Sequence, residues 1–169
     1  PRPFLALAPL EGVTDTVFRQ IIASTARPDV FFTEFTSAEG FCSEGKEHVA
    51  ENFVFTPKET PIIAQIWGKD PDMLYQTAQA VSTMGFSGID INMGCPVRDV
   101  MKTGCGAAMI DTPEIAKEAI DAVKRGANGL PVSIKTRLGN KSIQTEAWAS
   151  FLLEQGIAAL TLHGSTVKE

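Results

Sequence analysis

The sequence predicts an α/β protein whose parallel strands form a TIM (β/α)8-type barrel, with about six of the eight βα units present in its 169 residues. Short apolar runs recur along the chain, and helix-like stretches separate most of them, which indicates βαβ units and a parallel sheet. Polar residues stand at the carboxyl ends of four of these runs, where a barrel builds its active site. We therefore expect residues 1–169 to form a single, incomplete barrel domain.

The predicted strands are runs of about five to seven residues, rich in Ile, Val, Phe or Leu, as is typical of strands that helices cover on both faces. They cover residues 4–8, 30–35, 61–67, 88–93, 132–136 and 157–163. Helical spacing of apolar residues predicts helices over residues 15–26, 70–84, 112–126 and 143–155. Asp15 suits the N-cap of the first helix, and Pro71 suits the first turn of the second. Gly85, Gly126 and Gly156 stand where the last three helices should end.

The competing architecture is an open, doubly wound sheet. Its glycine-rich fingerprint would follow the first strand, but residues 8–15 read APLEGVTD instead. Polar residues at four strand ends favour the barrel, and they are Gln65, Asn92, Lys135 and His163. The predicted strands stop about two βα units short of a closed barrel.

Composition narrows the class of protein. The chain is 44% hydrophobic and 21% charged, and none of its apolar runs approaches the roughly 20 residues that span a bilayer. No secretory signal opens the sequence. Three cysteines without a Cys-x-x-Cys pair favour reduced thiols in a cytoplasmic protein, and no metal site is expected. The net charge of −5 has the wrong sign for a nucleic-acid binder, so charge alone predicts an enzyme that acts on a small molecule.

Cys95 lies between Gly94 and Pro96, just after the fourth predicted strand. Glycine permits unusual backbone angles before it and proline fixes the chain after it, so the thiol is placed to meet a ligand. A thiol with an ordinary pKa near 8.5 stays protonated at neutral pH and can donate a proton. A buried structural cysteine is the alternative, and the residues alone leave both open. We expect only structural roles for Cys42 and Cys105.

Lys135 is the unusual residue of the fifth predicted strand. Alternation places it on one face with Ser133 and Arg137. A lysine that points into a barrel needs an anion or a strong acceptor, although it could instead extend outward at the strand end. Gln65 and Asn92 are amides in apolar strands, and they suit a heterocycle with alternating donors and acceptors. His163 by itself is only weak evidence for a functional site.

Several motifs resemble those of tRNA-dihydrouridine synthases. Residues 8–15 resemble the opening strand and loop of that family, and residues 90–96, DINMGCP, resemble its signature, together with Lys102 and residues 104–109. Residues 131–137 and 162–164 match its next two strand ends. The resemblance covers essentially the whole chain, and its most specific part is the Asn-x-Gly-Cys-Pro motif.

This resemblance implies an FMN enzyme that reduces the C5=C6 bond of uridines in tRNA, with NADPH as reductant. It implies that Cys95 protonates C5 while hydride passes from flavin N5 to C6, and that Asn92 orients the flipped-out uracil. Lys135 would stabilise the anionic reduced flavin. The implied cofactor-binding residues are Pro9, Leu10, Glu11, Gln65, Lys135 and His163. The candidates for contact with the RNA are Arg98, Lys102, Arg137 and Lys141.

Two departures from the family pattern stand out. Ser165 occupies the position of an arginine in the family's His-Gly-Arg-Thr run. The last two βα units, which would hold the FMN phosphate, and the C-terminal helical domain that helps to hold tRNA are expected to be absent from residues 1–169. We therefore expect weak FMN binding, an exposed apolar barrel edge, and a need for the missing portion or a partner.

Two other functions remain open. One is an FMN barrel oxidoreductase that acts on a free pyrimidine, resembling dihydroorotate dehydrogenase, which fits the negative charge better but the Gly-Cys-Pro loop worse. The other is a non-catalytic partial barrel, which the short chain and Ser165 favour. The intact set of Asn92, Cys95 and Lys135 argues against it.

Overall fold

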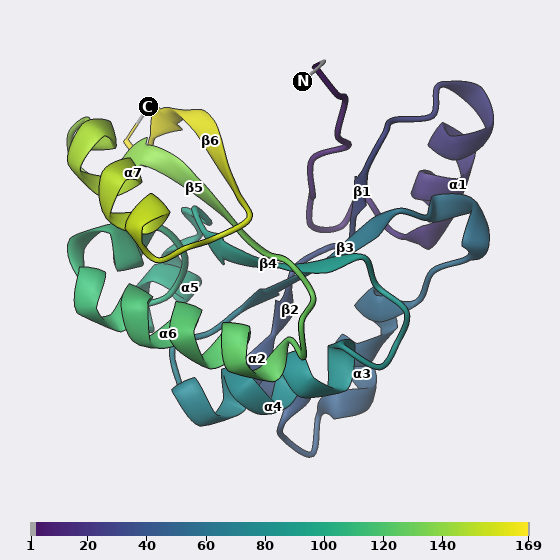
Figure 1. The fold of residues 1–169 in the computed structure, drawn as a ribbon, viewed down its shortest axis with the longest axis horizontal. Coiled ribbons are helices and arrows are strands. Elements are labelled where there is room, and N and C mark those ends of the chain that lie inside the picture. The colour runs from purple at the N-terminus through teal and green to yellow at the C-terminus, as the bar shows by residue number, and fades with distance from the viewer. Residues whose placement is uncertain (1–2, 169) are drawn as a thin grey trace.

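The computed structural model describes residues 3–168 and contains one parallel sheet that curves around an open side (Figure 1). The strand order is β1-β3-β4-β5-β6, and β2 pairs with β3 beyond the end of β1. The strands are β1 (Phe31–Phe32), β2 (Thr36–Ser37), β3 (Ile62–Trp67), β4 (Gly88–Met93), β5 (Val132–Gly139) and β6 (Ala159–Thr166). The order follows the sequence and every pairing is parallel, as expected of consecutive βα units.

The predicted helices form within a few residues of their expected bounds. The helices are α1 (Thr16–Thr25), α2 (Ala38–Phe41), α3 (Lys46–Ala50), α4 (Pro71–Val81), α5 (Arg98–Lys102), α6 (Pro113–Gly126) and α7 (Thr145–Glu154). Asp15 caps α1 by accepting a hydrogen bond from the Phe18 backbone N–H at 2.7 Å, and Pro71 occupies the first turn of α4. The short helices α2, α3 and α5 and the 3-10 turns η1 (Glu51–Phe53), η2 (Pro57–Glu59) and η3 (Gly106–Asp111) were not predicted, because single turns carry too little periodicity to detect.

The prediction of a full strand over residues 4–8 is wrong. Only a single bridge forms there, between Ala6 and Val30, and Phe4 and Leu5 are 65% and 74% exposed. The segment lies at an edge of the sheet, where it has backbone partners on one side only, so few hydrogen bonds hold it extended.

The strand predicted over residues 30–35 is divided into β1 and β2. The cause is Thr33, whose hydroxyl oxygen accepts the hydrogen bond from the Gln65 backbone N–H at 3.0 Å. A side chain thus takes the place of a backbone partner, and the ladder with β3 resumes only at Thr36. Strand β5 extends the predicted run by three residues, and β6 begins and ends later than predicted.

The helical ends show two different uses of glycine. Gly85 and Gly156 have positive φ values of 90° and 65°, as expected where a chain leaves a helix. Gly126 ends α6 for another reason, because a Cβ there would lie 2.4 Å from the Tyr75 carbonyl oxygen on α4. The glycine lets α4 and α6 pack closely against each other.

The two faces of the sheet have opposite characters. The outer face carries apolar residues such as Ile66, Ile91 and Ile134, which are fully buried under the helices. The inner face faces the open side, and the strand register places polar side chains there in rows. Gln65 pairs with Asp90 and Asp90 with Ser133, so these three lie side by side. This confirms the alternation predicted for β5.

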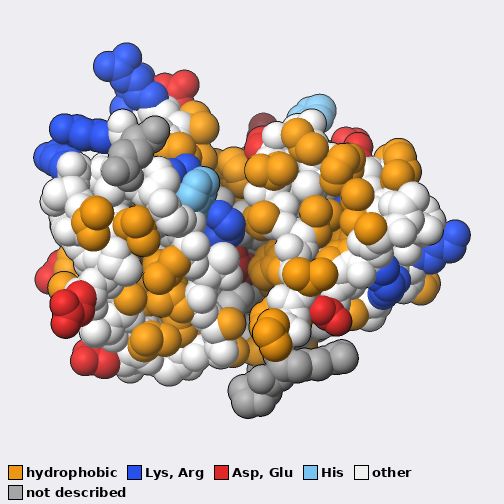
Figure 2. All heavy atoms as spheres, turned by 90° about the horizontal axis from the view of Figure 1, so that it is seen from above, with side chains coloured by type: hydrophobic (Ala, Val, Ile, Leu, Met, Phe, Trp, Pro, Cys, Tyr) orange, Lys and Arg blue, Asp and Glu red, His pale blue; other side chains and the backbone are white. Residues whose placement is uncertain are grey.

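The open side has apolar surface on one flank. Figure 2 looks onto this side and shows hydrophobic side chains gathered over the N-terminal segment and α1, across a hollow from β5 and β6. Leu10, Val17 and Ile21 are 53%, 60% and 56% exposed there, and Leu162 on β6 is 41% exposed. The exposed apolar surface therefore lies mainly at the N-terminal end of the sheet. Within residues 3–168, no helix combines the length and apolar character that crossing a membrane requires.

Candidate active site

A hollow of about 270 Å³ opens at the carboxyl ends of the strands. It is lined by Pro9, Leu10, Glu11, Phe35, Asn92, Gly94, Cys95, Pro96, Val97, Lys135, Arg137 and His163. Larger hollows of about 640 and 710 Å³ lie beside α6 and at the start of α7, but their lining side chains are exposed or half-buried. Another hollow, of about 430 Å³, is lined by the buried Arg19 and Glu34, but both side chains already form hydrogen bonds within the protein. Buried polar side chains converge on the smaller hollow, which makes it the candidate active site.

The strand register explains why residues far apart in the sequence meet in this hollow. Asn92 on β4 pairs with Lys135 on β5, and Arg137 on β5 pairs with His163 on β6. Neighbours in a parallel sheet point to the same face, so all four side chains reach the inner face at the carboxyl end. Cys95 follows directly after β4.

The loop that carries Cys95 is held from both sides. The Asn92 side-chain oxygen accepts hydrogen bonds from the backbone N–H groups of Gly94 and Cys95, at 3.1 and 2.9 Å. The Arg137 Nε donates to the Gly94 carbonyl at 2.7 Å. Gly94 does not have the positive φ that the sequence suggested. A glycine fits here because a Cβ at this position would lie only 3.1 Å from the Thr136 Cα.

Cys95 is 7% exposed and lies on the wall of the hollow. Burial raises its pKa above the ordinary thiol value, although the Val97 backbone and the charges of Arg137 and Lys135 oppose this shift. The sequence suggested an unshifted pKa, and the structure differs because the loop folds the thiol inward. A thiol with a raised pKa is protonated at neutral pH, which is the state that a proton donor needs.

Lys135 faces the hollow and is half-buried, so it does not extend outward. Burial lowers its pKa, and Asp90 opposes this shift. Within residues 3–168 Lys135 forms no ion pair. His163 is exposed at the rim, where the charge of Arg137 lowers its pKa. A half-buried ammonium group without a paired carboxylate is suited to an anionic ligand.

Gln65 lies beneath the hollow and is fully buried. Its Oε1 accepts from the Asn92 Nδ2 at 3.1 Å, and its Nε2 donates to the Asp90 Oδ2 at 2.7 Å. The Ser133 hydroxyl donates to the other Asp90 oxygen at 2.5 Å. Sequence reasoning missed Asp90 and Ser133 as site residues, although alternation along β4 and β5 places them on the same face as Asn92 and Lys135.

The loop of Pro9, Leu10 and Glu11 forms the opposite rim of the hollow. The Thr14 hydroxyl oxygen accepts from the Leu10 backbone N–H at 2.9 Å, and a Glu34 oxygen accepts from the Gly12 N–H at 2.5 Å. Gly12 has a positive φ of 71°, which a residue with a side chain adopts only with strain. Partial burial and the nearby Glu34 carboxylate raise the pKa of Glu11.

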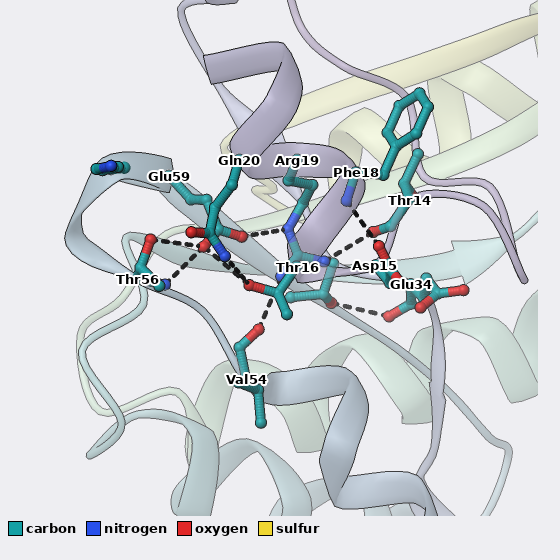
Figure 3. A network of polar contacts seen from close by, with 12 residues as sticks. Thr14, Asp15, Thr16, Phe18, Arg19, Gln20, Glu34, Val54, Thr56 and Glu59 are labelled. Carbon is teal, nitrogen blue, oxygen red and sulfur yellow. Dashed lines mark hydrogen bonds and ion pairs between the residues drawn. The ribbon is translucent and has the colours of Figure 1, made fainter. Parts of the chain in front are cut away.

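A buried ion pair lies behind this loop (Figure 3). Arg19 and Glu59 are 1% and 0% exposed, and their Nε and Oε1 atoms are 2.7 Å apart. Arg19 also donates to the carbonyls of Thr14 and Val54, at 2.7 and 2.8 Å. The second Glu59 oxygen accepts from the Thr56 backbone N–H at 2.6 Å. The sequence did not reveal this pair, because its partners are 40 residues apart.

Three predicted contact residues lie outside the hollow. Arg98 and Lys102 are on α5 and are exposed, and Lys102 pairs with Asp99 at 3.0 Å. Lys141 is also exposed. Their contact with RNA therefore stays a prediction. Ser165 lies beside Arg137, whose Nη1 donates to the Ser165 hydroxyl oxygen at 3.4 Å.

The hollow also contains a residue that the sequence did not suggest. Phe35 lines it and packs edge-on against Trp67, with ring centroids 6.4 Å apart and planes at 76°. The apolar surfaces of Pro9, Leu10 and Phe35 and the cationic Lys135 suit a planar ligand that carries negative charge at one edge. The residues present thus fit a flavin. No cluster of His, Cys, Asp or Glu suited to a metal ion occurs in the described part of the chain.

Comparisons with known proteins show the family of this chain. The sequence profile of the family described as "Dihydrouridine synthase (Dus)" matches residues 6–169. A "Probable tRNA-dihydrouridine synthase" of Staphylococcus aureus (strain COL) is 50% identical over 171 residues, which cover 100% of this chain and 52% of that protein. A "Probable tRNA-dihydrouridine synthase 2" of Bacillus subtilis (strain 168) is 47% identical with the same coverage. The chain spans about half the length of these curated relatives.

Solved structures share the fold at low sequence identity. A variant of NCR from Zymomonas mobilis has a TM-score of 0.64 at 15% identity and covers 95% of this chain and 64% of its own. Morphinone reductase in complex with tetrahydroNAD has a TM-score of 0.60 at 14% identity, with coverages of 94% and 69%. These matches confirm the predicted α/β partial barrel of the TIM type.

Proposed function

Because the chain belongs to the dihydrouridine synthase family, we propose that it carries the catalytic portion of an FMN-dependent enzyme that reduces uridine in tRNA to 5,6-dihydrouridine, with NADPH as reductant. The observation that carries this proposal is the placement of a protonated thiol, Cys95, in the same hollow as the unpaired ammonium group of Lys135. The Cys95 thiol can supply a proton, and the Lys135 ammonium group can stabilise the negative charge of a reduced flavin.

Cys95 is the proposed proton donor. When bound, FMN supplies the hydride that uracil C6 receives, and NADPH restores its electrons. The Cys95 thiol gives its proton to C5 and becomes a thiolate, which then regains a proton from solvent. The two hydrogens saturate the C5=C6 bond, and the raised pKa of Cys95 keeps the thiol protonated at neutral pH before the transfer.

The proposed cofactor residues line the hollow, except Gln65, which is fully buried beneath it. Pro9 and Leu10 would lie against the isoalloxazine ring, with Glu11 beside them. Lys135 would hold the N1/O2 edge, and its lack of an ion pair within the described residues leaves it available. His163 would contact the cofactor from the rim. Gln65 would reach the polar edge with its remaining N–H, since its other amide atoms already bind Asp90 and Asn92.

The proposed substrate residues are Asn92 and Arg137, with Arg98 and Lys102 further out on α5. A base inside a stacked RNA cannot enter a hollow at the end of a barrel, so the target uridine must leave its stack. Phe35 offers an aromatic face to the base or the cofactor. The basic residues outside the hollow would contact phosphates, which the acidic chain as a whole does not attract.

The net charge of −5 favours a second candidate, an FMN barrel oxidoreductase that acts on a free pyrimidine. Mapping dihydrouridine in the tRNAs of a strain without the gene separates the two. We expect one or more dihydrouridines to disappear from tRNA and to return when the gene is restored. Unchanged dihydrouridine in every tRNA would contradict the proposal, provided that no second enzyme of the family acts at the same position.

We expect residues 1–169, purified alone, to retain less than one FMN per chain. The edge strand β6 has no neighbouring strand beyond it within residues 3–168, so a flavin in the hollow would gain no contacts from a further strand beyond His163. The measurement is the flavin absorbance per protein after gel filtration. A stoichiometric, tightly held flavin spectrum would contradict this expectation.

A further inference from the structure

We propose that Asp90 is a positioning residue that orients the side-chain amides of Gln65 and Asn92 and, through them, fixes the loop that carries Cys95. In its consequence for catalysis the inference rests on the proposed function, since it concerns the residue proposed there as the proton donor. Its structural content can be tested without flavin or tRNA.

The three side chains and the loop form one continuous chain of hydrogen bonds across β3 and β4. The Asp90 carboxylate accepts from Gln65 at 2.7 Å, Gln65 accepts from Asn92 at 3.1 Å, and Asn92 accepts from the backbone of Gly94 and Cys95. Asp90 and Gln65 are fully buried, and Asn92 is 8% exposed. Water therefore has little access to replace a lost partner along this chain.

The direction of these hydrogen bonds is fixed at both ends. Backbone N–H groups can only donate, so Asn92 must present its oxygen to the Cys95 loop and its NH₂ group to Gln65. Gln65 must then accept with its oxygen and donate with its NH₂ group. An ionised carboxylate only accepts, and Asp90 stands where this last donor points. With an apolar residue at position 90, the Gln65 NH₂ group would be buried without an acceptor, and Asn92 alone would hold the Gln65 amide in its present orientation.

Ser133 makes the arrangement tolerant of a neutral group at position 90. Its hydroxyl donates to the second Asp90 oxygen, but a hydroxyl can rotate and accept instead. An asparagine at position 90 could then accept from Gln65 with its oxygen and donate to Ser133 with its NH₂ group. Burial raises the pKa of Asp90 to about 6, against the opposing effects of Ser133, Gln65 and Lys135. Protonated Asp90 would use the same arrangement in mild acid.

The substitutions Asp90→Asn and Ser133→Ala are expected to have non-additive effects on the Cys95 loop. Asp90→Asn alone and Ser133→Ala alone each leave an acceptor for Gln65 and should have little effect on the Cys95 loop. The double variant leaves the NH₂ group of the new asparagine without an acceptor, whichever way the amide is turned. Asp90→Leu removes the acceptor directly, so it should resemble the double variant.

The readout is the rate at which iodoacetamide alkylates Cys95 in the full chain, followed by mass spectrometry of the cysteine-containing peptides between pH 7 and pH 9. We expect roughly tenfold faster alkylation of Cys95 in the double variant and in Asp90→Leu, because a loosened loop exposes the thiol and lowers its raised pKa. The single variants Asp90→Asn and Ser133→Ala should stay within about twofold of the parent protein.

Cys105 is the internal control, since the residue is 1% exposed and does not line the hollow. If Cys105 becomes reactive together with Cys95, Asp90 supports the fold in general and the proposal is overturned. Unchanged Cys95 reactivity in both the double variant and Asp90→Leu overturns it equally. If Cys95 responds as expected but the parent enzyme reduces no uridine, the proposed function fails while the positioning role of Asp90 stands.

Discussion

Replacing Cys95 by alanine is expected to lower the rate of uridine reduction by about 10²- to 10⁴-fold, which is the usual contribution of a positioned acid. The thiol is the residue that can give a proton to C5 in the proposed reaction, and alanine removes the proton while changing the side-chain volume little. The loop should persist, because Asn92 and Arg137 hold it through backbone atoms. The measurement is the single-turnover rate on unmodified tRNA, with the flavin reduced beforehand.

Cys105→Ala is the matched control for this prediction. It removes a thiol that is also buried and whose pKa burial also raises, but that does not line the hollow. We expect the control to reduce uridine at close to the parent rate. If the Cys95→Ala variant reduces uridine at the parent rate, the thiol is not the proton donor and its role is structural.

The pH dependence of the same rate tests the protonation state of Cys95. A proton donor acts only while it is protonated, and a raised pKa extends that range upward. We therefore expect the rate to persist through the ordinary range of thiol pKa values, near 8.5, and to fall only at higher pH. A decline that begins well below pH 8 would assign the titration to another group.

Arg19→Met is expected to lower the free energy of unfolding by about 3–5 kcal/mol, the usual effect of breaking a buried ion pair on one side. The substitution leaves the Glu59 carboxylate buried without its cation and removes hydrogen bonds to the carbonyls of Thr14 and Val54. Urea unfolding of the full chain, followed by circular dichroism, measures the change.

An exposed ion pair in the same protein provides the control. Lys117 and Asp121 on α6 are 2.6 Å apart but 54% and 50% exposed, so Lys117→Met should change stability by less than about 1 kcal/mol. The double variant Arg19→Met/Glu59→Met removes both charges and should recover part of the loss. If Arg19→Met is no more destabilising than Lys117→Met, the buried pair does not stabilise the fold.

Arg19 also connects stability with the site. It holds the Thr14 carbonyl, and Thr14 in turn holds the Leu10 backbone at the rim of the hollow. A loop fixed in this way is available to a planar ligand without further ordering, which reduces the entropy lost on binding. The loss of Arg19 should therefore weaken flavin binding under conditions where the chain is still folded.

Much of the site could be predicted from local patterns. Period-two alternation along β5 correctly assigned Lys135 and Arg137 to the inner face, because the side-chain directions of a strand depend only on its own sequence. The strand ends correctly grouped Asn92, Lys135 and His163 at one edge. The edge segment of residues 4–8 was predicted wrongly, because apolar content does not reveal whether a strand has neighbours on both sides.

The sequence by itself determined the βα order, the alternation of each strand and the Gly-Cys-Pro loop, since these features depend on residues that are close in the chain. Only the tertiary structure decided which polar groups became partners. Asp90 and Gln65 are 25 residues apart in sequence, and Arg19 and Glu59 are 40 apart. Such pairs form only when strand order and register bring their strands and loops together, and burial then makes each partner necessary to the other.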